Sequence, residues 1–72
     1  MSELKHPGKI EMVDAERDTS HTVDAAGAPP SVAFVDGRPV TKIVKSRRGD
    51  DVVLRSYGAD GALLSTTVGR AG

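Results

Sequence analysis

The pattern of apolar and polar residues between positions 31 and 69 predicts an antiparallel β-meander. Four runs rich in β-branched residues are separated by short, glycine-containing stretches. We expect strands at 31–35 (SVAFV), 38–45 (RPVTKIVK), 51–57 (DVVLRSY) and 62–68 (ALLSTTV). Asp36-Gly37 is the strongest turn signal, because a two-residue type I′ turn needs positive φ at both central positions. Asp60-Gly61 is a second turn of this kind, and residues 47–50 are expected to form a four-residue loop.

Residues 1–30 give weaker signals. Residues 9–15 (KIEMVDA) favour a short strand, although the same residues also permit the start of a helix. Together with the β-prone residues 20–25 they predict a hairpin over the acidic segment 9–25, with disorder as the alternative. Residues 26–30, which end in Pro29-Pro30, form a linker. Residues 1–8 and 70–72 are expected to be flexible ends.

The predicted fold class is therefore all-β. It is a small antiparallel meander of four to six short strands, built either as a sheet or as an SH3-like small barrel. The N-terminal segment is either partly disordered or an added hairpin.

The predicted turn lengths also fix which side chains share a face, because cross-strand partners lie on the same side of a sheet. With these lengths Val44 lies opposite Val53, and Tyr57 lies opposite Leu64. One face then holds Ala33, Val35, Val40, Val44, Val53, Tyr57, Leu64 and Val68, and the other holds Val32, Phe34, Ile43, Val52, Leu54 and Leu63. Since a lone meander in water should have one polar face, we expect the N-terminal segment, a second copy or closure into a barrel to cover the second apolar face.

Composition narrows the function classes. The chain has 72 residues, with no Trp, one Phe and one Tyr. It has no Cys, so no disulfide, thiolate nucleophile or Cys-based zinc site is available. A core this small needs a large sheet, a partner chain or a ligand for stability. No apolar run approaches the ~20 residues needed to span a bilayer. We expect a soluble, cytoplasmic protein with no membrane partner.

The neutral net charge hides an uneven distribution. Residues 1–30 hold six acids and three bases, and residues 31–72 hold four acids and seven bases. Such asymmetry indicates either an acidic tail beside a basic binding surface or two halves that attract each other, and we favour the second.

Several residues suggest chemistry that the sequence does not otherwise support. The basic residues near the predicted 47–50 loop suggest contacts to an anion or a nucleic acid: Lys42, Lys45, Arg47, Arg48 and Arg55. His6 and His21 are well separated in the sequence and lack a metal-ligand spacing, and Ser20-His21 lacks the setting of a catalytic triad. We therefore predict no catalytic residue, no metal site and no cofactor.

Residues 55–67 (RSYGADGALLSTT) place Tyr57 before a Gly61 turn and a following apolar residue. This hairpin is similar to one unit of the tyrosine-aspartate repeats of large bacterial β-shell toxins. Gly58 stands where the repeat has Asp after the tyrosine. The resemblance implies a β-hairpin over this segment, and no function is carried over from it.

The leading functional prediction is a small non-enzymatic β protein that acts in protein–protein interaction or self-assembly, with a homodimer as its simplest form. The predicted interface residues are Val32, Phe34, Ile43, Val52, Leu54 and Leu63. The alternative is a small nucleic-acid-binding barrel that uses the basic loop around Arg47-Arg48. A third hypothesis, which we favour least, is an enzyme. Separately from these three, residues 1–30 are a candidate disordered acidic tail that folds on a partner.

Overall fold

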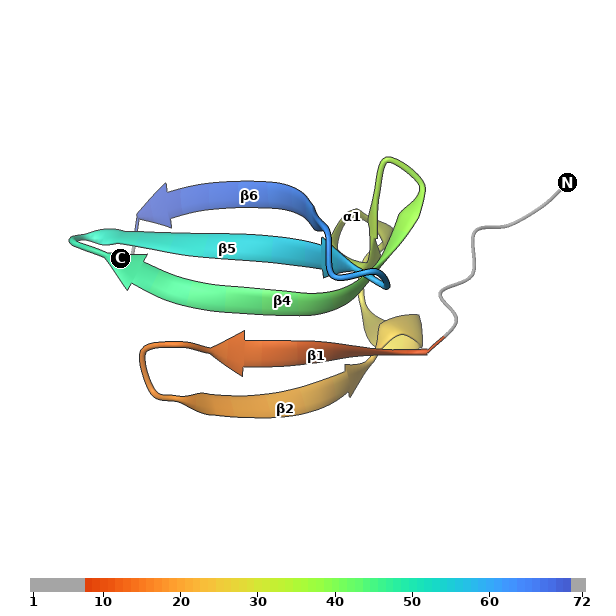
Figure 1. Ribbon diagram of the computed structural model, residues 1–72, viewed down its shortest axis with the longest axis horizontal. Helices are drawn as coiled ribbons and strands as arrows, with labels where there is room; N and C mark the ends of the chain where they lie inside the picture. Colours follow the sequence, from red (N-terminus) through yellow and green to blue (C-terminus); the bar gives the residue numbers. More distant parts are fainter. Residues whose placement is uncertain (1–7, 71–72) are drawn as a thin grey trace, which may run out of the picture.

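The computed structural model describes residues 8–70 of the chain, and most of them lie in strands (Figure 1). The elements in chain order are β1 (Lys9–Asp14), β2 (Thr19–Asp24), the 3₁₀ turn η1 (Ala25–Gly27), α1 (Pro30–Ala33), β3 (Phe34–Val35), β4 (Arg38–Arg48), β5 (Asp51–Gly58) and β6 (Leu63–Arg70). The sheet order is β2-β1-β4-β5-β6, and β3 pairs with the start of β4. No helix in the described range is long and apolar enough to cross a bilayer.

The mostly-β class is confirmed, but two details of the prediction are wrong. The sheet is mixed, because β1 runs parallel to β4 while the other pairs are antiparallel. It is also open, with β2 and β6 at its two edges, so the barrel alternative is excluded. A parallel pair needs a long crossover, and here the crossover consists of β2, η1, α1 and β3.

The N-terminal segment adopts the predicted hairpin. In the turn between β1 and β2, the Asp14 carboxylate accepts hydrogen bonds from the backbone N–H groups of Glu16 (3.1 Å) and Arg17 (3.3 Å), which is an Asx-type turn. Asp18 closes the turn with a φ of 54°. Residues 1–7, which include His6 and most of the predicted flexible N-terminus, lie outside the described residues.

This hairpin widens the sheet beside β4 rather than covering one of its faces (Figure 1). The parallel register places Glu11 beside Lys42 and Asp14 beside Lys45. Beyond the strand end, the Ala15 N–H donates to the Lys45 carbonyl at 2.8 Å. The acidic N-terminal half and the basic C-terminal half are therefore neighbours, as the charge asymmetry predicted.

Residues 31–33 form a helical turn, so the predicted strand over 31–35 is wrong for its first three residues. Pro30 stands at the first helical position, where its fixed φ favours a helix and its missing N–H is not needed. The N–H groups of Val32 (2.9 Å) and Ala33 (3.0 Å) both donate to the Pro29 carbonyl. The turn places Ala33 in the core at 2% exposure, where an extended chain would have continued along the sheet.

The turns of the meander confirm one prediction and correct two. Asp36 and Gly37 have φ values of 50° and 77°, as a type I′ turn requires. The β4–β5 turn has two residues rather than four, with Gly49 at φ 63°, and it moves the partner of Val44 from Val53 to Arg55. The β5–β6 connection is longer than predicted: the Gly61 N–H donates to the Gly58 carbonyl at 3.0 Å, and Gly61 has a φ of 81°.

Two register shifts change the predicted faces. One falls between Val40 and Lys42, where Thr41 is the extra residue, and it places Val40 on the same side as Ile43. The other, in β6 opposite Tyr57, pairs Tyr57 with Leu63 rather than Leu64. We call the two sides the Ile43 face, which includes Ile10, Met12, Val40, Ile43, Lys45, Arg47, Val52 and Leu54, and the Tyr57 face, which includes Glu11, Val13, Lys42, Val44, Val53, Arg55, Tyr57, Leu63 and Val68.

The core is small and aliphatic, and it lies at the end of the sheet near α1 and η1. Its cluster consists of Ile10, Ala25, Ala33, Val40 and Ile43, with Phe34, Val35 and Leu64 among the partly buried side chains packed against it. The two short helical turns and β3 therefore cover one end of the Ile43 face. Val53, on the Tyr57 face, is also buried (4% exposed) but does not belong to this cluster.

Candidate functional site

The outer side of β6 is the main unpartnered feature of the fold, and we call it the β6 edge. Among the described residues no strand pairs with this side (Figure 1). In a strand paired on one side only, alternate backbone N–H and C=O groups point outward without a ladder partner. The β6 edge therefore offers a row of hydrogen-bonding groups to an incoming strand.

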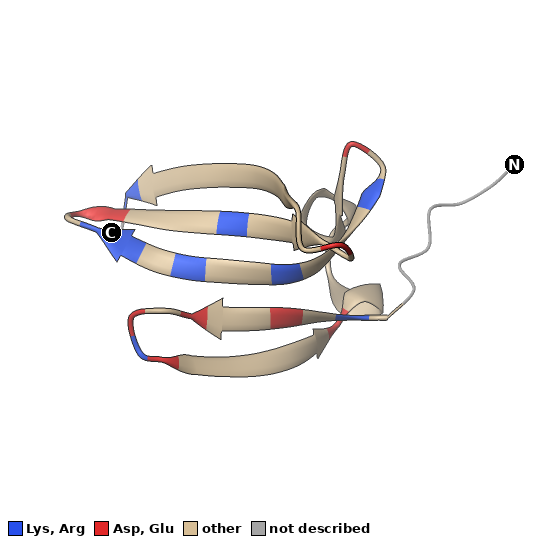
Figure 2. Ribbon diagram, in the orientation of Figure 1, with Lys and Arg blue, Asp and Glu red and all other residues tan. Residues whose placement is uncertain are grey.

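The side chains of β6 do not protect this edge. From Leu63 to Gly69 the strand has no charged residue and no proline, the usual features that prevent edge-to-edge pairing. Leu63 is 53% exposed and Val68 is 60% exposed, and both lie on the Tyr57 face. Figure 2 shows that charge marks only the ends of this strand, with Asp60 in the preceding loop and Arg70 at its last position.

The opposite edge, β2, is different in character. Its exposed side chains are Thr, Ser, His and Asp, and its one large apolar residue, Val23, packs against the core. Both edges have open backbone groups, but only the β6 edge adds exposed apolar side chains. A partner strand would therefore gain apolar burial at β6 and not at β2.

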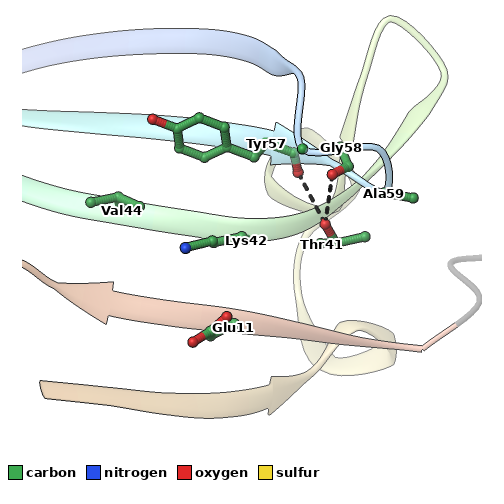
Figure 3. A pocket seen from close by; sticks show the side chains of 8 residues that line it. Glu11, Thr41, Lys42, Val44, Tyr57, Gly58 and Ala59 are labelled. Carbon is green, nitrogen blue, oxygen red and sulfur yellow. Dashed lines mark hydrogen bonds between the residues drawn. The ribbon is translucent and has the colours of Figure 1, made fainter.

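A groove of about 570 Å³ lies on the Tyr57 face (Figure 3). Glu11, Lys42 and Tyr57 line it, and they are consecutive register partners on β1, β4 and β5; Leu63 continues the row on β6. The groove owes its shape to the bulge at Thr41, whose hydroxyl donates to the Gly58 carbonyl at 2.9 Å and lies 3.4 Å from the Tyr57 carbonyl. The row thus offers a carboxylate, an ammonium group and a phenol beside apolar surface.

This groove offers charged groups and hydroxyl groups to a polar ligand. Glu11 is its one carboxylate, and its lining has neither His nor Ser. In the described part of the chain, no group of three or more His, Asp or Glu residues could hold a metal ion.

The predicted interface residues do not form one surface. Ile43 is 5% exposed and belongs to the core, and Phe34 is half-buried against that core. Val32 (40% exposed) lies on α1, Leu54 (37% exposed) and the half-buried Val52 lie on the Ile43 face of β5, and Leu63 lies on the Tyr57 face of β6. Of the six, Leu63 is the one that reaches the β6 edge.

The five predicted anion contacts are also divided. Lys42, Arg48 and Arg55 belong to the Tyr57 face, whereas Lys45 and Arg47 belong to the Ile43 face. Figure 2 shows these bases spread along β4 and β5 rather than gathered at one point. Arg47 also lies 3.8 Å from Glu16 in the β1–β2 turn, which partly neutralises its charge.

Val68 and the β6 edge were missed by the sequence prediction. Residues 61–69 form a continuous stretch without charge, which was the available signal. Its position at an edge could not be read from this stretch, because the edge depends on where the N-terminal hairpin docks. The comparisons of the chain with protein-family models, curated proteins and solved structures gave no match.

Proposed function

We propose that this chain is a non-enzymatic protein-interaction module, and that it extends its sheet by accepting a strand along the β6 edge. The observation that supports this proposal is the partly apolar stretch from Leu63 to Gly69, which carries no charge and makes up all of the edge strand β6 except its last residue. Strand addition is a common mode of protein recognition: backbone hydrogen bonds supply affinity, and alternate side chains supply specificity.

The energetics favour a modest affinity. Apolar burial stabilises a complex by about 25 cal/mol per Å², and Leu63 and Val68 are the two most exposed of the large apolar side chains in the described residues. A single edge strand contributes a small contact area, which is typical of transient complexes. The Tyr57 groove lies on the same face as these two side chains and adds polar contacts for a partner that crosses from the edge onto the face.

The proposal is tested by charging each edge in turn. Thr66→Glu places a carboxylate beside Arg55 on β5, and Thr22→Lys places an ammonium group beside Glu11 on β1. Each new charge has an opposite charge on the neighbouring strand, so both variants should keep the fold. Urea unfolding and circular dichroism check that they do.

Association is then measured for both variants. Light scattering over a range of protein concentrations reports binding between copies, and capture on immobilised chain followed by rebinding of the purified partner reports binding to other proteins. We expect Thr66→Glu to weaken association at least tenfold and Thr22→Lys to leave it unchanged. Association that is equal in both variants and the wild type, or no association with any protein, contradicts the proposal.

A further inference from the structure

We infer that the strand accepted at the β6 edge is β6 of a second copy, paired antiparallel about a two-fold axis that passes by Thr66. This inference rests on the proposed function and names its partner. A two-fold axis perpendicular to the sheet leaves each face continuous across the two copies, so the Tyr57 faces join. Three features of β6 support this register.

The first feature is the placement of the apolar side chains. In β6 the extra residue of the bulge is Leu64, and Leu63 and Val68 both lie on the Tyr57 face, on either side of Thr66. Antiparallel pairing about Thr66 brings Val68 of one copy beside Leu63 of the other, and the two-fold axis makes this contact twice. The two most exposed large apolar side chains of the described chain, at 53% and 60%, then bury each other.

The second feature is the charge at the two ends of the strand. Asp60 precedes β6 in the β5–β6 loop, Arg70 ends β6, and no charged residue lies between them. An antiparallel partner brings each Arg70 to the loop that holds Asp60 of the other copy, so opposite charges meet at both ends. A parallel partner would place like charges side by side, which is unfavourable.

The third feature is the requirement that paired residues share a face. Pairing about Thr66 places Thr66 opposite its own copy on the Tyr57 face and Ser65 opposite Thr67 on the Ile43 face. A shift of the axis to Thr67 would also keep the faces matched, but it would place Val68 opposite Thr66 and leave Leu63 near Arg70. The Thr66 axis is therefore the register with the best apolar contact.

The chain has no cysteine, so single cysteine variants test this register directly. Residues directly opposite in an antiparallel pair have Cβ atoms about 4.5–5.5 Å apart, near the range of a disulfide, whereas diagonal residues are about 7–8 Å apart. Thr66→Cys places the two thiols directly opposite, and Thr67→Cys places them on the diagonal. Thr22→Cys on the β2 edge measures the rate of cross-linking by random collision.

Each variant, at micromolar protein concentration, is treated with oxidised glutathione. The formation of the covalent dimer is followed on non-reducing gels. We expect Thr66→Cys to cross-link at least tenfold faster than Thr67→Cys and Thr22→Cys. Light scattering of the wild type should show a concentration-dependent rise towards twice the 7.5 kDa chain mass. Equal cross-linking rates in the three variants, or a wild type that stays monomeric at millimolar concentration, overturn the inference.

This result is separable from that of the edge-charging experiment. Association that is lost in Thr66→Glu without rapid cross-linking of Thr66→Cys leaves the proposed function standing with another partner or register. Insensitivity to both substitutions removes the two proposals together.

Discussion

At the scale of single residues, the fold depends on a few positions with unusual backbone geometry. Asp36 and Gly37 both have positive φ, and together they return the chain from β3 to β4. Thr41 is the extra residue of a bulge, and its hydroxyl holds the bulge against the end of β5. Each of these residues decides which face the following side chains occupy.

Gly37→Ala should destabilise the protein by about 1–2 kcal/mol, because a Cβ is unfavourable at a φ of 77°. The effect is purely conformational, since nothing lies within 4 Å of the position that the Cβ would take. Gly69→Ala is the matched control: its surroundings are equally open and its φ is not positive. Urea unfolding should show a lower midpoint for Gly37→Ala alone, and equal midpoints would contradict the prediction.

The sequence predicted the turn at Asp36-Gly37 and did not predict the bulge at Thr41. The Asp-Gly pair identifies a type I′ turn in the sequence because few residue pairs tolerate two positive φ values. A bulge has no such residue requirement, and the extra residue at Thr41 is visible only in the pairing of β4 with β5. The predicted faces were therefore wrong for Val40, which lies with Ile43 in the core.

At the scale of elements, the parallel contact between β1 and β4 joins the two halves of the chain. Its register pairs the acids of one strand with the lysines of the other, Glu11 with Lys42 and Asp14 with Lys45. The charge distribution in the sequence predicted this attraction. It did not predict a parallel arrangement, because the direction is set by the helical turns that return the chain from β2 to β3.

Glu11→Lys should lower stability, since it places two ammonium groups side by side on β1 and β4. We expect a loss of about 0.2–1 kcal/mol, the usual range for a cross-strand charge pair. The double variant Glu11→Lys with Lys42→Glu restores the pair in reverse and should recover most of this loss. Urea unfolding of the four members of the cycle measures the coupling, which should shrink in 1 M salt; a coupling of zero would contradict the contact.

At the scale of the whole molecule, an open sheet with two faces and two edges distributes its charge widely. The five predicted anion contacts on β4 and β5 are divided between the faces, so neither face gathers all five. Binding to a phosphate backbone depends on several cations that act on the same side. This division of the charge agrees with our proposal of a protein partner at the β6 edge rather than nucleic acid on a face.

A fluorescent single-stranded oligonucleotide should show no saturable rise in anisotropy with micromolar protein at about 50 mM salt. The double variant Arg47→Ala with Arg48→Ala should behave as the wild type does. Binding that falls steeply with added salt and disappears in this variant would instead support the basic loop as a nucleic-acid contact.

The β1–β4 contact also affects how the chain folds. Met12 and Ile43 are register partners although they lie far apart in the sequence, while β4, β5 and β6 pair across short turns. Closing a long loop costs more entropy than closing a short one, so local hairpins form early and distant parallel pairs form late. The meander should therefore form first and present an unpaired β4 until the acidic hairpin docks. During this interval the nascent sheet has two open edges, β4 and β6, and the late hairpin closes the one at β4.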